Sequence, residues 1–260
     1  MITSAKNPKV QWVRGLQARA SDRRRENAFV VEGVRMAEEA AQSGWRPRLA
    51  FYTDELSARG LVVIKQLHEI GAEVEHVSEA VMRTASDTDT PQGILVVLEK
   101  QELRWLEPLN FVLILDQIRD PGNLGSILRT AAAAGVQVVF LPPDSVDSYS
   151  PKVVRAGMGA HFRLVIRKAS WEEILQCIEE YHLRVFLADA SAGVAYQDVD
   201  FHRAFALIIG GEAQGASSKA IEEAEQNVNI PMPGGGDSLN AAAAAAILLF
   251  EVARQRRSLR

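Results

Sequence analysis

Polar side chains that could bind and orient a ligand occur at three places in the sequence, each beside glycine residues. Asn123 and Arg129 lie in DPGNLGSILRT, Glu212 lies in IIGGEAQGAS, and Ser238 and Asn240 lie in IPMPGGGDSLN. Glycine lets a ligand approach the backbone closely, and a helix start presents free N–H groups to it. The three segments therefore predict a site for a polar small molecule, oriented by a few amide, hydroxyl, carboxylate and guanidinium groups.

The spacing of these glycines disfavours two common nucleotide sites. A dinucleotide-binding turn needs G-x-G-x-x-G directly after a strand, but the first segment contains G-N-L-G and the second contains G-G-x-x-x-G. A Walker loop needs G-K-S or G-K-T, and neither occurs in the chain. A dinucleotide-dependent oxidoreductase is therefore the weaker alternative, which a titration with the cofactor would test.

The elements that must position these segments are the strands of a parallel sheet. The segments lie at the ends of three apolar runs, Phe111–Leu115, Phe205–Ile209 and Val228–Ile230. Such runs alternate with helix-length periodic segments from residue 109 onward, which is typical of a doubly wound parallel sheet, where ligands bind at the carboxyl ends of the strands. We therefore expect the three segments to converge at one edge. Further strands are expected at Val138–Leu141, Arg163–Ile166 and Arg184–Ala188, and helices at Lys152–Gly157, Trp171–Tyr181, Ser218–Glu225 and Asn240–Arg254.

A second, smaller α/β domain is predicted for residues 1–100. Its expected strands are Ala28–Glu32, Leu49–Thr53, Glu73–Val77 and Gly93–Leu98, and its expected helices are Val34–Ser43, Ser57–Ile70 and Glu79–Ala85. The stretch EKQELRWLEP at Glu99–Pro108 is polar, contains a proline and interrupts the alternation of elements. We therefore predict domains at residues 1–100 and 109–260, joined by a linker at residues 101–108.

Charge is unevenly distributed along the chain. The formal net charge is −4, but residues 1–48 carry ten Lys and Arg side chains against five acidic ones. A basic lobe on an acidic protein is typical of a region that binds a polyanion, although a solvated charged surface gives the same pattern. Trp12 and Phe29 in this lobe could stack on bases, but their apolar neighbours favour positions in the core.

The single cysteine, Cys177, suits a reducing compartment, and we expect a cytoplasmic protein. Cys177 lies in a helical pattern and is expected to be buried. No His or second Cys stands at metal-ligand spacing from it, so no metal site is expected. No apolar run reaches the ~18 residues that span a bilayer, and no membrane association is expected.

The three segments resemble, in order and spacing, the motifs of the SpoU (TrmH-type) RNA ribose 2′-O-methyltransferases of the SPOUT superfamily. The matching residues are N-L-G-x-x-x-R, I-I-G-G-E-A-Q-G and I-P-M-P-G-G-G-D-S-L-N-A. ITSAKNPKV and FVVEGVRMAEEA also resemble the substrate-binding domain of that family. The resemblance thus covers nearly the whole chain.

This resemblance implies a fold, a cofactor and an assembly. It implies a small N-terminal L30e-like α/β domain, followed by a doubly wound parallel-sheet domain with a deep trefoil knot. It further implies that S-adenosyl-L-methionine binds in the knot and that the protein is a homodimer through the catalytic domain. The implied reaction is methylation of a ribose 2′-hydroxyl in structured RNA, with ribosomal RNA favoured. A transfer-RNA enzyme and a non-catalytic RNA-binding homologue are the alternatives.

The resemblance also implies roles for individual residues. The residues expected to contact the cofactor, several of them through their backbones, are Gly210, Gly211, Ile230, Met232 and Leu239. The expected catalytic residues are Asn123, Arg129, Glu212, Ser238 and Asn240. The basic lobe is expected to dock RNA through phosphate contacts from Lys6, Lys9, Arg14, Arg23, Arg24 and Arg25.

Two roles remain open for Arg129. The family pattern matches it to the proposed general base for the 2′-hydroxyl. A guanidinium is a poor base at neutral pH, however, because it stays protonated in proteins. The second role is to hold the adjacent phosphate and favour ionisation of the hydroxyl, leaving its proton to water.

Overall fold

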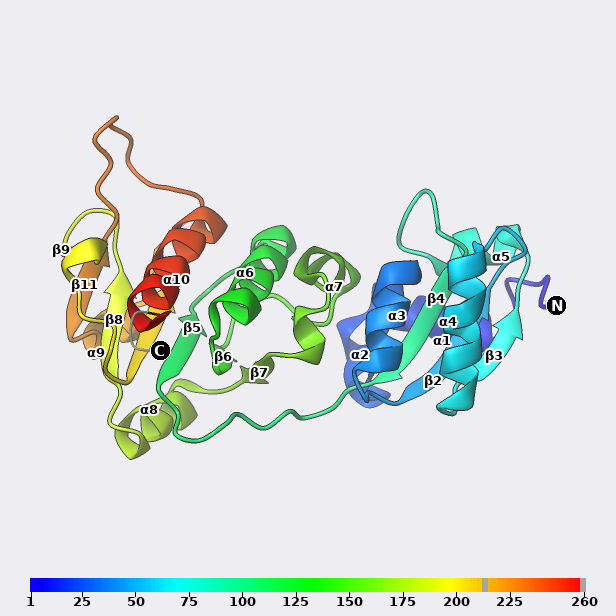
Figure 1. Cartoon of the computed structure of the whole chain (residues 1–260). Helices are drawn as coiled ribbons and strands as arrows, with labels where there is room; N and C mark the ends of the chain where they lie inside the picture. The colour runs from blue at the N-terminus through cyan, green and yellow to red at the C-terminus, as the bar shows by residue number, and fades with distance from the viewer. Residues whose placement is uncertain (212–214, 258–260) are drawn as a thin grey trace. The chain divides into compact units, whose positions relative to one another are not determined.

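The computed structural model describes residues 1–211 and 215–257 of the 260-residue chain. Contacts between Cα atoms divide the chain into two units. The first unit comprises Met1–Glu102 and Tyr149–Phe162, and the second comprises Leu103–Ser148 and Arg163–Arg260. Each unit has a sheet of its own (Figure 1).

The sheet of the first unit has four strands in the order β1-β4-β2-β3. Its strands are β1 (Ala28–Glu32), β2 (Pro47–Tyr52), β3 (Glu73–His76) and β4 (Ile94–Glu99). Strand β4 pairs antiparallel with β1 and β2, and β2 pairs parallel with β3. Strands β1, β2 and β3 therefore begin at the edge where β4 ends.

Helices cover both faces of this sheet. Helices α1 (Pro8–Ala18) and α5 (Glu79–Ala85) bury apolar side chains against one face, in a cluster that includes Val13, Phe51 and Met82. Helices α3 (Val34–Gln42) and α4 (Ala58–Glu69) contact the strands and each other, and a short helix α2 (Ala20–Arg25) precedes β1. The unit therefore has the α/β character that its sequence predicts.

The segment Tyr149–Phe162 departs from the predicted domain boundaries. It contains α7 (Pro151–Gly157) and the 3₁₀ helix η1 (Ala160–Phe162), and it belongs to the first unit although it lies within predicted residues 109–260. Its aromatic rings explain this placement, because Tyr149 lies 5.0 Å from Phe29 and Phe162 lies 5.5 Å from Trp45 between ring centroids. The contacts of this segment therefore group it with the first unit, whereas the predicted second domain includes it.

The predicted linker is also partly fixed. Gln137 accepts hydrogen bonds from the backbone of Asn110 (2.7 Å) and Phe111 (2.9 Å), and it donates to the carbonyls of Leu106 (2.7 Å) and Pro108 (2.9 Å). Leu103 and Trp105 pack against the core of the second unit, so the predicted linker from residue 103 belongs to that unit.

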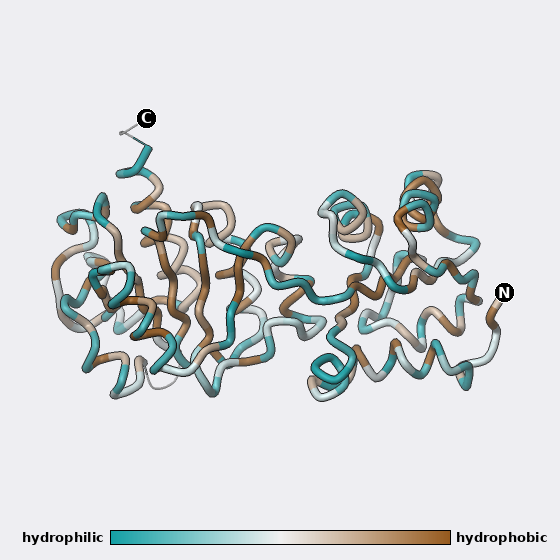
Figure 2. The backbone as a smooth tube through the Cα atoms, turned by 90° about the horizontal axis from the view of Figure 1, so that it is seen from below, coloured by the Kyte–Doolittle hydropathy of each residue, from teal (hydrophilic) through white to brown (hydrophobic). Residues whose placement is uncertain are grey.

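The second unit is built on a seven-stranded sheet in the order β7-β6-β5-β10-β8-β11-β9, and every pair of neighbours is parallel. The strands are β5 (Phe111–Leu115), β6 (Val138–Leu141), β7 (Val165–Lys168), β8 (Arg184–Ala188), β9 (Val194–Ala195), β10 (Phe205–Ile209) and β11 (Gln226–Asn229). Figure 2 shows the central strands of this sheet as predominantly hydrophobic. The predicted α/β class and parallel sheet are confirmed.

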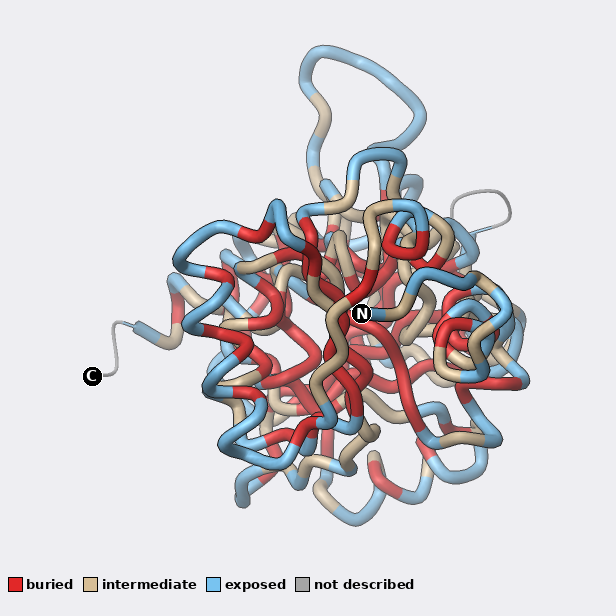
Figure 3. The backbone as a smooth tube through the Cα atoms, turned by 90° about the vertical axis from the view of Figure 1, so that its right-hand side faces the viewer, coloured by how far each residue is buried: buried red, intermediate tan, exposed pale blue. Residues whose placement is uncertain are grey.

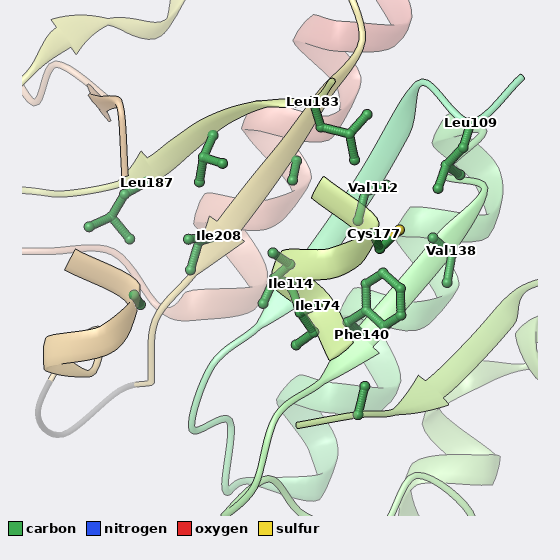
Figure 4. Packing of buried hydrophobic residues seen from close by; sticks show 14 of the residues in the cluster. Leu109, Val112, Ile114, Val138, Phe140, Ile174, Cys177, Leu183, Leu187 and Ile208 are labelled. Atoms are coloured by element: carbon green, nitrogen blue, oxygen red, sulfur yellow. The ribbon is translucent and has the colours of Figure 1, made fainter. Parts of the chain in front are cut away.

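The two faces of this sheet carry different helices. Helices α8 (Trp171–Glu180) and α9 (Ser218–Glu223) pack on one face through Ile174, Cys177 and Ala220 (Figure 4). Helices α6 (Pro121–Ala134) and α10 (Ala241–Arg257) contact each other on the opposite face (Figure 1). A 3₁₀ helix, η2 (Tyr196–Asp198), follows β9. The site segments precede or begin α6, α9 and α10.

Candidate active site

The first and third segments meet through the side-chain amides of Asn123 and Asn240. Asn240 Nδ2 donates a hydrogen bond of 3.0 Å to Asn123 Oδ1 across 117 residues of chain. Helix capping positions both groups. The side chain of Asp120 accepts from Asn123 N (2.8 Å), and Asn240 Oδ1 accepts from Ala242 N (2.9 Å) and Ala243 N (3.3 Å). Asn240 therefore caps α10 and holds Asn123 at the same time.

A cavity of about 280 Å³ lies at the carboxyl ends of β8, β10 and β11, beneath the first turns of α10. Its described lining includes all five residues predicted to contact a cofactor, Gly210, Gly211, Ile230, Met232 and Leu239. Ser238 also lines it, from an exposed loop over residues 231–240 that appears pale blue in Figure 3. The structure thus brings the glycines of the second segment and the Ser-Leu pair of the third into one cavity.

Two glycines of the lining have no room for a side chain. A Cβ on Gly210 would lie 2.5 Å from Ala216 N, and one on Gly211 would lie 2.5 Å from Gln117 O. The loop closes on itself through two backbone hydrogen bonds between Gly211 and Gly215, of 3.0 and 3.2 Å. Glycine is therefore required here by the close approach of neighbouring backbone.

A buried carboxylate fixes the far end of this loop. Asp116, directly after β5, is 1% exposed, and its Oδ2 accepts a 2.6 Å hydrogen bond from Ser217 N at the start of α9. Asp116 thereby joins the end of β5, four residues before the first segment, to the second segment. The sequence prediction did not include Asp116, although its position after an apolar strand was a usable signal.

Glu212, a predicted catalytic residue, lies outside the described residues.

Arg129 lies apart from the cavity lining. It occupies the exposed surface of α6, six residues or ~9 Å along the helix axis from Asn123, with Ser126 between them. Within the described part of the chain it has no ion-pair partner.

The cavity also has a wall that the sequence prediction missed. Ala188, Asp189 and Ala190 line it from the end of β8. Asp189 accepts hydrogen bonds from Ser191 N (2.8 Å) and from Asn227 Nδ2 (3.0 Å). The N–H of Ser191 is the largest of several effects that hold the pKa of Asp189 below its usual value. The acid is therefore ionised at neutral pH.

The predicted RNA contacts fall into three groups. Lys6, Arg14 and Arg24 are exposed. Lys9 and Arg25 are already paired, Lys9 with Glu73 (2.6 Å) and Glu75, and Arg25 with Glu26 (3.0 Å) and Asp22 (3.1 Å).

Arg23 requires a correction. It is 4% exposed, and its Nη1 donates to the carbonyls of Leu16 (2.6 Å) and Gln17 (3.0 Å) at the end of α1. A guanidinium buried against backbone carbonyls is not available to a phosphate, so the prediction for Arg23 was wrong. Its sequence neighbours gave no sign of this, because burial depends on how α2 turns back on α1.

No helix within residues 1–211 and 215–257 has the length and apolarity to cross a membrane.

Comparison with known proteins gives matches over both units. Residues 110–250 match the SpoU rRNA Methylase family, and residues 7–96 match the MRM3-like substrate binding domain. The chain is 32% identical over 251 residues to 23S rRNA (guanosine(2553)-2'-O)-methyltransferase RlmP of Bacillus subtilis, covering 96% of this chain and 98% of that protein.

Two solved structures share the fold across nearly the full length. The AdoMet-bound rRNA methyltransferase of Sinorhizobium meliloti is 30% identical with a TM-score of 0.87, covering 100% of this chain and 98% of the other. The SpoU methyltransferase AviRb of Streptomyces viridochromogenes, in complex with AdoMet, is 28% identical with a TM-score of 0.89, covering 97% and 99%. Since the family match spans more than half of the sequence and includes all three site segments, the chain belongs to the SpoU rRNA methylase family.

Proposed function

We propose that this protein transfers a methyl group from S-adenosyl-L-methionine to a ribose 2′-hydroxyl of ribosomal RNA. The observation that carries the proposal is the hydrogen bond between Asn240 and Asn123, which joins two family motifs beside the glycine-lined cavity. RlmP and the Sinorhizobium enzyme are named for ribosomal RNA, and both solved relatives contain AdoMet. Ribosomal RNA is therefore preferred to transfer RNA as the substrate.

The residues of the cavity fit S-adenosylmethionine. Ile230, Met232 and Leu239 provide an apolar wall for a flat adenine ring, and Gly210 and Gly211 expose backbone groups that can recognise its edge. A volume of about 280 Å³ is close to the lower end of small-molecule pockets. Ser238 and the ionised Asp189 offer polar partners for the sugar and amino-acid parts of the cofactor.

The chemistry divides between cofactor and protein. S-adenosylmethionine supplies an activated methyl group when bound. Asn123 and Asn240 hold the acceptor ribose in line with the cavity, and orientation of this kind lowers a barrier by several kcal/mol. Arg129 holds the phosphate next to that ribose and favours the ionised hydroxyl, while the proton passes to water. A protonated guanidinium cannot itself accept the proton.

The family resemblance also supports a knot and a dimer. Strand β10 lies between β5 and β8, and the chain after β11 returns to place α10 beside α6. This order of strands and helices supports the trefoil-knotted path.

Phe250 is 53% exposed on α10, on the same outward surface as Ala243, and Ala133 is exposed on α6. An apolar, small-residue surface of this kind supports a homodimer through α6 and α10.

The first unit is the RNA-docking part in this proposal. The exposed Lys6, Arg14 and Arg24 would contact phosphates, without reading sequence. The proposed location is the cytoplasm, which the single cysteine supports because it suits a reducing compartment.

Two measurements test the proposal together. Calorimetry should detect AdoMet binding, and purified 23S ribosomal RNA from cells lacking the protein should accept labelled methyl groups. Arg129→Ala should bind AdoMet normally but lose methylation. RNA binding with no AdoMet binding would instead indicate a non-catalytic RNA-binding homologue.

A further inference from the structure

We propose that Arg48, held in place by Trp12, is a phosphate-binding contact through which the first unit docks the RNA backbone. This inference rests on the proposed function, since it concerns the RNA that the enzyme methylates. Arg48 was counted among the basic residues of the sequence but was not predicted to bind RNA. We call the two residues the Trp12–Arg48 pair.

Contacts from two other segments fix the guanidinium of Arg48. Its carbon Cζ lies 5.0 Å from the centroid of the Trp12 ring on α1, within the range of a cation–π interaction. Its Nη1 donates a 2.9 Å hydrogen bond to the carbonyl of Glu26, which follows α2. Trp12 in turn packs against the apolar core of the unit. The guanidinium is thus oriented before any ligand arrives, which lowers the entropic cost of binding.

The charge of Arg48 is not neutralised. Arg48 is exposed, and among the described residues no carboxylate lies within ion-pair distance of it. The acids of the neighbouring elements are matched to other bases. These pairs are Glu26 with Arg25 (3.0 Å), Glu99 with Arg46 (3.5 Å), and Glu73 (2.6 Å) and Glu75 with Lys9.

The guanidinium of Arg48 also has N–H groups beyond the one that donates to Glu26. It carries five N–H groups, and the structure assigns one of them to the Glu26 carbonyl. The remaining N–H groups can form the paired hydrogen bonds that a phosphate accepts.

The surroundings of Arg48 are basic. Strand β2 begins at the edge of the sheet where β1 also begins and β4 ends, as the pairs Ala28 with Glu99 and Pro47 with Leu98 show. Arg24 just before β1 and Arg46 just before β2 are exposed at this edge. Arg46 is paired with Glu99, whereas Arg24 and Arg48 have no carboxylate partner among the described residues. Two unpaired cations near one edge favour a polyanion over a single small anion.

The same geometry decides whether Trp12 stacks on an RNA base or belongs to the core. One side of the indole faces the guanidinium and the ring packs on the core, so a base cannot stack there. Trp12 therefore acts on RNA through Arg48, as a platform, and the pair recognises phosphate rather than base identity.

The test compares five full-length variants in binding to purified 23S ribosomal RNA at several salt concentrations. Arg48→Ala should weaken binding roughly 3- to 10-fold at ~0.1 M salt and lower the slope of log K against log salt by about 1. Arg59→Ala is the matched control, because it removes a charge that Glu38 already pairs. Arg48→Lys should recover part of the affinity and the full salt slope.

Trp12→Leu tests the platform. It leaves the charge of Arg48 in place, so affinity should fall less than in Arg48→Ala, and the salt slope should stay at the wild-type value. A melting curve checks that this variant is folded. The double variant should bind no more weakly than Arg48→Ala alone, because Trp12 acts through Arg48.

Binding of Arg48→Ala equal to that of Arg59→Ala would overturn the inference while leaving the proposed function intact. Failure of the wild-type protein to bind or methylate ribosomal RNA, with AdoMet binding retained, would instead count against the proposed substrate. If Arg48 serves an acidic protein surface, the RNA affinity of Arg48→Ala will be unchanged, which also overturns the inference.

Discussion

The amide of Asn240 has two separable functions at the residue scale, because its oxygen caps α10 and its nitrogen holds Asn123. Asn240→Asp retains the oxygen acceptor and removes the donor. We predict unchanged stability, within about 0.5 kcal/mol, because the cap on α10 is retained. The methylation rate should fall about 10-fold or more, because Asn123 Oδ1 loses its donor and an unpaired polar group costs about 1–3 kcal/mol. Chemical denaturation and single-turnover kinetics measure the two effects.

Asn240→Ala is the matched comparison, since it removes both functions. Its stability should fall by about 1 kcal/mol through loss of the cap. Equal rates for wild type and Asn240→Asp would show that the contact with Asn123 has no part in the reaction.

A side chain at Gly211 should weaken cofactor binding. The Cβ in Gly211→Ala would meet Gln117 O at 2.5 Å, and that backbone cannot yield without moving the cavity wall. We predict an AdoMet affinity at least about 10-fold weaker, which corresponds to an overpacking cost of 1–3 kcal/mol. Gly234→Ala, whose Cβ has no neighbour within 4 Å, is the control and should bind AdoMet as the wild type does.

Cys177 should make stability depend on alkaline pH. Burial raises the pKa of its thiol to about 11, whereas the thiol of the unfolded chain ionises near its ordinary value of about 8.5. The contribution of this group is complete below the unfolded pKa and is lost as the pH rises towards 11. Unfolding free energies of wild type and Cys177→Ala should therefore converge between pH 8 and 11. Parallel curves would contradict the assignment.

Some residue roles could be predicted from sequence and others could not. Glycines and polar groups after strands indicated the cavity wall at Gly210 and Gly211, because strand ends of a parallel sheet meet at one edge. The burial of Arg23 could not be foreseen, since it depends on two carbonyls of α1. The pairing of Arg48 with Trp12 joins residues 36 positions apart that no local pattern connects.

At the element scale, strands were predicted better than short helices. The bounds predicted for β5, β6, β8 and β10 are those observed, because continuous apolar runs between polar turns are typical of buried parallel strands. Helices α1 and α2 and the two-residue strand β9 were not predicted as elements. Helix α2 has six residues and carries Arg23, Arg24 and Arg25, so it lacks the apolar periodicity that identifies a helix.

The end of α10 is anchored by Arg256, which we expect to be a major source of stability. It donates to Phe201 O (2.9 Å), Asn110 Oδ1 (2.7 Å), Asn110 O (2.9 Å) and Arg203 O (3.1 Å), and it lies over the ring of Phe205. Arg256→Ala should lower the free energy of unfolding by about 2–4 kcal/mol, because several carbonyls lose their donor.

The adjacent Arg257→Ala is the control, since Arg257 is exposed at the same helix end. It should change stability by no more than about 0.5 kcal/mol. Urea denaturation of both variants measures the difference, and equal stabilities would show that the anchor contributes nothing. Among the basic residues in the last turn of α10, Arg256 is therefore engaged with the protein rather than free to contact RNA.

At the scale of the whole molecule, the proposed dimer depends on the exposed surface of α10. Phe250→Asp places a charge where an apolar contact between copies is expected. Sedimentation should show a protein of twice the chain mass for wild type and a shift towards monomer for Phe250→Asp. Arg257→Asp is the control, since it introduces the same side chain at an already polar position. A monomeric wild type would contradict the proposed assembly.

The division into two units could be predicted only in part from the sequence. A polar stretch after β4 indicated the boundary near Glu102, but Tyr149–Phe162 joins the first unit through aromatic contacts with Phe29 and Trp45. Contacts between distant segments of this kind leave no periodic pattern in the sequence, so the order of elements along the chain does not group this segment with the first unit.

The most direct test of the account is to identify the atom that receives the methyl group. Ribosomal RNA from cells lacking the protein is incubated with the enzyme and labelled AdoMet, digested to nucleosides and separated by mass spectrometry. We predict label in a single 2′-O-methylnucleoside, and none when the same RNA position carries 2′-deoxyribose; Asn240→Asp should introduce the same label at a rate reduced about 10-fold or more. Label on a base, or transfer to the deoxyribose substrate, would contradict the account.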